Sequence, residues 1–81
     1  MSKSFTAPLT RSPEDLVAAA REKARAHGAV FEGDAAAGRF AARGVEGTYA
    51  VADGQVRVTV TKMPALAPWV LVESELRKFF S

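Results

Sequence analysis

The sequence has no cysteine and only one histidine among its 81 residues. Without cysteine the chain has no disulfides, no thiolate metal ligands and no cysteine nucleophile. The single histidine, His27, lacks the second histidine or tight carboxylate cluster that metal or triad chemistry requires, and its place at the end of a predicted helix indicates capping or solvation. No glycine motif for phosphate binding occurs. The residues therefore predict a protein that is not an enzyme and has no cofactor or metal.

The chain also lacks a long apolar run and a strong excess of charge. Its longest uncharged stretch, residues 63–72, is about half of the roughly 20 residues that a membrane-spanning helix needs. The first ten residues contain no apolar core of the kind found in signal peptides. Eleven basic and nine acidic residues are interspersed and leave a net charge of +2, which does not favour nucleic acid as a partner. We expect a cytoplasmic protein without a transmembrane segment.

The composition is that of one small globular domain, with 48% apolar and 25% charged residues. A core of this size usually contributes only about 3 to 5 kcal/mol, which favours self-association as a weak homodimer. Residues 1–11 are expected to be a loose N-terminal arm, although Phe5 and Leu9 offer a way to tether it as an edge strand. Residues 12–81 are expected to form the domain.

The first helix is marked at both ends. Ser12 is in position to cap it, Pro13 suits its first turn, and Asp15 completes an S-x-x-D form of the capping box. Gly28 is suited to end it in the left-handed conformation. The pattern predicts a helix over residues 12–27. Its apolar face is narrow and suits close packing on a sheet; it consists of Leu16, Val17, Ala20 and Ala24.

Apolar residues at a spacing of two, separated by turn residues, predict three or four antiparallel strands after this helix. Asp53 and Gly54 are a two-residue hairpin signature. Earlier turns are expected between Gly33 and Gly38 and in the G-V-E-G segment at residues 44–47. The predicted fold class is a small α+β domain. An antiparallel β-meander is flanked by N- and C-terminal helices packed on one face, in the order α-β-β-β(-β)-α.

The face of the sheet away from the helices is predicted to carry three arginines, Arg39, Arg43 and Arg57, among threonines. These arginines suggest an alternative function, a basic face that binds nucleic acid or an acidic partner. The face lacks the aromatic side chains that stack on RNA bases. Charged side chains on edge strands also hinder aggregation, which explains them without a ligand.

The C-terminal segment has more apolar residues than one buried helix face needs. It predicts a helix from Pro68 onward whose apolar stripe faces the sheet: Trp69, Val72, Leu76 and Phe79. Four apolar residues are then left for an exposed patch: Leu66, Val70, Leu71 and Phe80. Such a patch predicts self-association or binding to a hydrophobic surface. Basic and acidic residues balance around it, which favours a protein or neutral apolar material over an anionic bilayer.

A third hypothesis is that the domain carries a small ligand between the sheet and the helices. It predicts a cavity lined by four residues: Phe31, Tyr49, Val58 and Trp69.

The order of these features resembles one known protein family. Four short motifs carry the resemblance: F-E-G-D at residues 31–34, F-x-x-x-G-V-x-G at residues 40–47, V-x-V-x-V at residues 56–60 and V-E-S-E-L-R-K-F-F at residues 72–80. From about residue 16 to residue 80 the chain is similar to the polyhydroxyalkanoic acid system proteins, also called polyhydroxyalkanoate granule-region proteins. The resemblance implies an intracellular accessory role near polyhydroxyalkanoate granules, with a granule or a granule-associated protein as partner and no catalytic signature.

Overall fold

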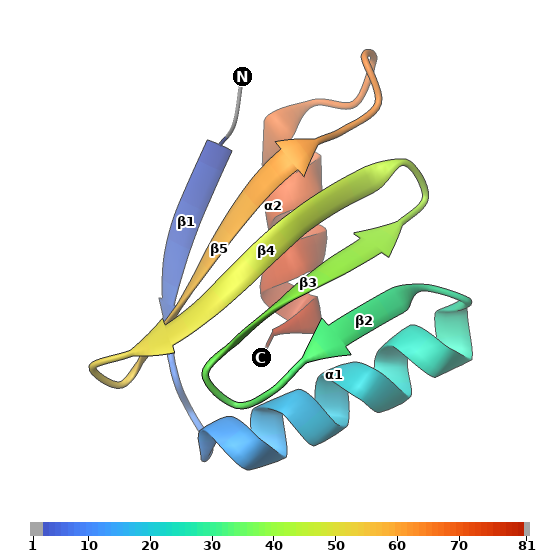
Figure 1. Ribbon diagram of the computed structural model, residues 1–81. Coiled ribbons are helices and arrows are strands. Elements are labelled where there is room, and N and C mark those ends of the chain that lie inside the picture. The colour runs from blue at the N-terminus through green and yellow to red at the C-terminus, as the bar shows by residue number, and fades with distance from the viewer. Residues whose placement is uncertain (1–2, 81) are drawn as a thin grey trace.

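A computed structural model describes residues 3–80. These residues form strand β1 (Lys3–Pro8), helix α1 (Pro13–His27), strands β2 (Val30–Gly33), β3 (Ala37–Ala42), β4 (Val45–Ala52) and β5 (Gln55–Lys62), and helix α2 (Trp69–Phe79). The strands make one antiparallel sheet in the order β1-β5-β4-β3-β2. In Figure 1, α2 lies behind the sheet and α1 runs along the β2 edge. Buried side chains of α1 and partly buried side chains of α2 join one core cluster with those of the sheet, which confirms the α+β class.

Helix α1 begins and ends at the predicted residues. Ser12 is the N-cap, and its Oγ accepts a hydrogen bond from the Asp15 backbone N–H at 3.2 Å. Gly28 ends the helix with φ at 68°, in the left-handed region. Ala20 and Ala24 are buried in the helix face that meets the rest of the domain. Their small side chains let the helix backbone lie close to its neighbours.

Two basic side chains attach α1 to the rest of the domain. Arg21 Nη2 donates a hydrogen bond to the Gly33 carbonyl at the end of β2. Lys23 Nζ donates to the Lys78 carbonyl in the last turn of α2 at 2.9 Å. The last carbonyls of a helix have no partner within the helix, so the lysine satisfies one of them. The two helices are therefore joined by a side-chain hydrogen bond at this end of α2.

The N-terminal segment is an edge strand, which corrects the expectation of a loose arm over residues 1–11. Strand β1 pairs antiparallel with β5 along its length, with Phe5 opposite Val58. Phe5 is buried in the core, and the Leu9 N–H donates to the Gly54 carbonyl at 3.0 Å. The strand forms because it covers the free edge of β5 and because Phe5 gains burial there. Residues 1 and 2 of the expected arm lie outside the described residues.

Two of the hairpin turns lie where two successive residues adopt positive φ. Asp53 (φ 54°) and Gly54 (φ 74°) form the predicted turn between β4 and β5. The turn between β3 and β4 consists of Arg43 (φ 52°) and Gly44 (φ 83°), so the expected turn over residues 44–47 is wrong. Gly47 lies inside β4, where an added Cβ would be 2.7 Å from Cζ of the Phe40 ring. The backbone carbonyl of Thr59 on β5 lies closer still, so the close approach of the neighbouring strand and of this ring, and not a turn, requires glycine at that position.

One row of residues across the sheet shows how the core is filled. The row consists of Phe5, Val58, Tyr49, Gly38 and Gly33, one from each strand. The two glycines leave room for the ring of Tyr49, whose hydroxyl donates to the Asp34 carbonyl at 2.7 Å. Phe31 stacks on the same ring with centroids 5.1 Å apart. The large ring of Tyr49, packed beside Gly33 and Gly38, thus fills the core near β2.

Candidate interaction surface

The connection from β5 to α2 is a compact turn between two prolines. The Ala67 N–H donates to the Pro64 carbonyl at 3.1 Å. Pro68 is the N-cap of α2, and its carbonyl accepts hydrogen bonds from the N–H groups of Leu71 and Val72. Proline fixes φ near the value that the first turn of a helix needs. One hydrogen bond and two prolines thus shape residues 63–68 at the start of the helix.

The inner side of α2 crosses the sheet. Near its start, Trp69 lies against Phe5 of β1 with ring centroids 6.4 Å apart. Phe79, near its end, lies 6.0 Å from Phe31 of β2. Val72 between them is buried, and Leu76 is partly buried against the core cluster. The predicted apolar stripe of the helix is confirmed.

Phe80 belongs to the core, so its predicted place in the exposed patch is wrong. Only 4% of its surface is exposed, and its ring centroid lies 5.7 Å from that of Phe40 and 5.6 Å from that of Tyr49. Phe80 follows Trp69 by 11 residues, which is close to three full turns of 3.6 residues, so both residues face the sheet. The spacing of Phe80 from Trp69 is therefore the sequence signal that identifies Phe80 as a core residue.

The other three residues of the predicted patch are at the surface. Leu66 is 98% exposed, Val70 is 78% exposed and Leu71 is 56% exposed. We call these three residues the apolar patch. Leu66 lies in the turn before α2, and Val70 and Leu71 are exposed in its first turn. The other side of the helix lies against the sheet (Figure 1). Scattered apolar residues are common on protein surfaces, but three large ones within six residues form a candidate contact site.

The charges near the apolar patch neutralise one another. Arg77 bonds Glu73 on the next turn of the helix, with Nη2 and Oε2 2.7 Å apart, and Lys78 Nζ lies 3.9 Å from Glu75 Oε1. Lys62, at the end of β5, is 3.6 Å from Glu46. The outer side of α2 therefore has no excess of either sign. A surface of this kind attracts an anionic bilayer only weakly.

The structure does not bring the three candidate arginines together. Arg39 and Arg57 lie on the open face, on strands separated by β4, and Arg57 is opposite Ala50 while Arg39 is opposite Thr48. Strand spacing puts their backbones roughly 12 Å apart. Arg39 is occupied by Glu32 on the neighbouring strand, through two hydrogen bonds. Arg43 is in the β3–β4 turn and not on a strand, which corrects its predicted position.

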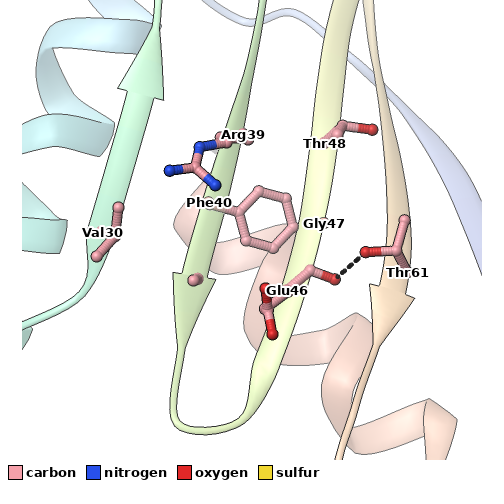
Figure 2. A pocket seen from close by; sticks show the side chains of 8 residues that line it. Val30, Arg39, Phe40, Glu46, Gly47, Thr48 and Thr61 are labelled. Atoms are coloured by element: carbon pink, nitrogen blue, oxygen red, sulfur yellow. Dashed lines mark hydrogen bonds between the residues drawn. The ribbon is translucent and has the colours of Figure 1, made fainter.

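A shallow depression of about 180 Å³ lies on the open face between β2 and β5. Figure 2 shows Arg39 and Glu46 at its sides and the hydrogen bond from Thr61 Oγ1 to the Glu46 carbonyl, which measures 3.2 Å. Both charged side chains are already paired, Arg39 with Glu32 and Glu46 with Lys62. A charged ligand would have to displace these ion pairs, so the depression does not support the basic-face alternative.

The residues expected to line an internal ligand cavity do not surround a common space. Phe31 and Tyr49 are in stacking contact near the β2 edge. Trp69 lies near the opposite edge of the sheet, against Phe5 of β1. Val58 is fully buried between these groups. The hypothesis of a small ligand carried inside the domain is therefore not supported by this arrangement.

Among residues 3–80 no group of three or more histidine, cysteine, aspartate or glutamate side chains is placed to hold a metal ion. His27 is exposed in the last turn of α1. Burial raises the pKa of the Tyr49 hydroxyl, which is donating to a carbonyl inside the domain. This tyrosine has a structural partner and is not poised to act as a base.

Neither helix in the described part of the chain has the length and apolar content to cross a membrane. Comparisons of the chain with protein-family models, with curated proteins and with solved structures find no match.

Proposed function

We propose that this chain is a non-catalytic cytoplasmic accessory protein that acts by contact through the apolar patch. In this proposal the patch binds neutral apolar material, either on a twin subunit or on an apolar body. The resemblance to polyhydroxyalkanoic acid system proteins suggests a polyhydroxyalkanoate granule as that body. The observation that carries the proposal is the exposure of Leu66, Val70 and Leu71. They lie at the start of a helix whose inner side already packs against the core.

The size of the patch limits how tightly it binds. Complete burial of one leucine or valine side chain contributes roughly 1.5 to 3 kcal/mol, so burial of all three contributes roughly 5 to 9 kcal/mol. Association costs about 4 kcal/mol or more in lost translational and rotational freedom. The patch alone therefore supports weak and reversible binding. Such binding suits a dimer that forms at high local concentration, or adsorption of many copies to one extended surface.

The electrostatic setting favours a neutral surface. Glu73 and Glu75 are matched by Arg77 and Lys78 on the same helix. Binding to anionic lipid depends on unpaired lysine and arginine near the surface, each contributing about 1 kcal/mol. The paired charges leave little of that attraction. Protein or neutral polyester is the better match.

The test uses one substitution in the patch and one matched substitution on the open face. Leu71→Glu places a charge in the patch, while Ala50→Glu places the same side chain on an exposed strand position of the open face. We expect the wild type to sediment with polyhydroxybutyrate granules, to self-associate, or both. Leu71→Glu should reduce this binding at least fivefold, and Ala50→Glu should leave it unchanged. Circular dichroism checks that both variants are folded.

If folded Leu71→Glu protein binds granules and self-associates as the wild type does, the patch is not the contact site and the proposal is wrong. Anionic vesicles serve as a second control. Stronger binding to these vesicles than to neutral granules would contradict the electrostatic part of the proposal.

A further inference from the structure

The sheet has one edge that a helix covers and one that none covers. At the β2 edge, α1 runs alongside the strand, and Arg21 Nη2 donates a hydrogen bond to the Gly33 carbonyl (Figure 1). Within residues 3–80, no helix or strand lies beside the outer edge of β1. An uncovered edge strand presents unpaired backbone groups that can pair with another strand. The outer edge of β1 is therefore the open edge of the sheet.

The register of β1 with β5 shows which backbone groups face this open edge. The Leu9 N–H donates to the Gly54 carbonyl, and the two residues are opposite each other in the register that continues from β1. Residues of an antiparallel strand bond the neighbouring strand alternately. Counted back from Leu9, every second residue bonds β5, and the residues between them direct their backbone groups outward: Ser4, Thr6 and Pro8.

The outward groups form a short pairing site. Ser4 and Thr6 each present an N–H and a carbonyl, whereas Pro8 presents a carbonyl alone because proline has no N–H. A lysine can also obstruct an edge, but Lys3 Nζ lies 5.7 Å from the centroid of the Trp69 ring, on the side of the sheet that α2 covers. Two donors and three acceptors are thus left for an extended segment that pairs with β1.

The charge next to this edge is positive. Together, β1 and β5 contain three basic residues and no acidic residue. Lys62 is paired with Glu46, but Arg57 takes part in no ion pair in the described part of the chain. Arg57 lies on the open face, directly opposite Thr6. On an added strand, a residue opposite Thr6 would share this face about 10 Å from Arg57, a distance that glutamate and arginine side chains together can span.

We infer that the outer edge of β1 binds an extended acidic peptide segment, which joins the sheet as an additional antiparallel strand. The backbone groups of Ser4 and Thr6 provide the pairing, and Arg57 selects a carboxylate on the open face. A second copy of β1 is the poorer partner because it would bring the same positive charges to the edge. The inference goes beyond the proposed function and uses no residue of the apolar patch, so either can fail without the other.

NMR of the nitrogen-15-labelled protein tests the edge directly. The probe is the capped peptide S-T-V-E-V-T-S, used at concentrations up to about 1 mM because the site is short and binding is weak. The peptide should shift the amide signals of Ser4 and Thr6 and slow their exchange with solvent at least fivefold. The amides of Phe5 and Ala7, which already bond β5, should change less than twofold. If the exchange of Ser4 and Thr6 is unaffected, the inference is wrong.

Two N-methylated peptides distinguish strand pairing from attraction between charges. A glutamate on the open face lies opposite Ser4 or Thr6, so its own N–H points toward β1, while the N–H of the following valine points to solvent. Methylation of the glutamate nitrogen should therefore weaken binding at least tenfold, and methylation of the valine nitrogen less than threefold. Equal binding of the two methylated peptides would show that no strand is added to the sheet.

The preference for an acidic segment is tested with Arg57→Gln and with Arg39→Gln, a matched change on the same face of the sheet. The wild type should bind the glutamate peptide at least fivefold more tightly than a peptide with lysine in its place. Arg57→Gln should lose this preference and Arg39→Gln should keep it, with circular dichroism to check that both variants are folded. Equal binding of the two peptides by the wild type, or an unchanged preference in Arg57→Gln, would overturn the assignment of an acidic partner.

Discussion

At the residue scale, exposure separates apolar side chains that look alike in the sequence. Leu71 and Phe80 lie on the same helical segment, yet Leu71 is 56% exposed and Phe80 only 4%. Phe80 contacts the rings of Phe31, Phe40 and Tyr49 at the β2 side of the core. Leu71 points away from the sheet because it lies about 160° around the helix from Trp69. Of the two residues, only Leu71 is free to contact a partner.

This difference predicts unequal costs for truncation. Phe80→Ala should lower the free energy of unfolding by about 3 to 5 kcal/mol, because it removes a buried ring and leaves a cavity. Leu71→Ala should change it by less than about 0.5 kcal/mol. Urea unfolding followed by circular dichroism at low protein concentration measures both. Equal stability of the two variants would show that Phe80 is not part of the core.

At the element scale, the turn between β2 and β3 is held by Asp34. Its Oδ1 accepts hydrogen bonds from the backbone N–H groups of Ala36 at 2.8 Å and Ala37 at 3.1 Å. Its carbonyl accepts the hydrogen bond from Tyr49. The N–H of Ala36, followed by that of Ala37, holds the pKa of the Asp34 carboxyl below its usual value of 3.8. An acidic residue in a turn commonly shapes that turn, and the structure shows that Asp34 does so here.

The lowered pKa predicts a specific dependence of stability on pH. A carboxyl with a lower pKa in the folded state adds stability above its unfolded value of 3.8, and this stability is lost as the pH falls through the folded value. The urea midpoint of the wild type should therefore exceed that of Asp34→Ala at pH 6, and the difference should shrink toward pH 2. Asp34→Asn, which keeps an acceptor but no titrating group, is the control. A difference that stays constant from pH 6 to pH 2 would show that the ionised carboxylate does not stabilise the turn.

At the scale of the whole molecule, the sheet is completed by β1, the strand that is farthest in sequence from the strand with which it pairs. β1 pairs with β5, about 50 residues later, and α1 connects β1 to β2 at the opposite edge. The Cα radius of gyration is 11.7 Å, which is close to the value of about 12 Å expected for a compact domain of this length. The fifth strand, β1, thus brings Phe5 against Trp69 and Val58, which the four strands β2 to β5 alone would leave without this cover.

The closing strand should therefore be essential to the fold. Phe5→Ala should destabilise the domain by about 3 to 5 kcal/mol, comparable to the whole stability expected from a core of this size. Thr6→Ala, on the exposed side of the same strand, should cost less than about 0.5 kcal/mol. Thermal unfolding followed by circular dichroism measures both. A Phe5→Ala variant as stable as the wild type would mean that the N-terminal segment is indeed a loose arm.

The sequence by itself determined the features that depend on neighbouring residues. Ser12 and Gly28 bound the first helix, Asp53 and Gly54 form the hairpin, and the apolar period gives α2 its inner side. It also identified Leu66, Val70 and Leu71 as surplus apolar residues, because a helix face of fixed width has no place for them. Caps, turns and periodicity act within a few residues, so the chain encodes them locally.

Only the tertiary structure decided the features that depend on distant residues. It made β1 a strand because the β5 edge is available, and it requires glycine inside β4 because the Thr59 carbonyl and the Phe40 ring lie there. It assigned Phe80 to the core and separated Arg39 from Arg57 by a strand. Pairing and packing join residues far apart in the chain, so they follow from the assembled sheet and not from local pattern.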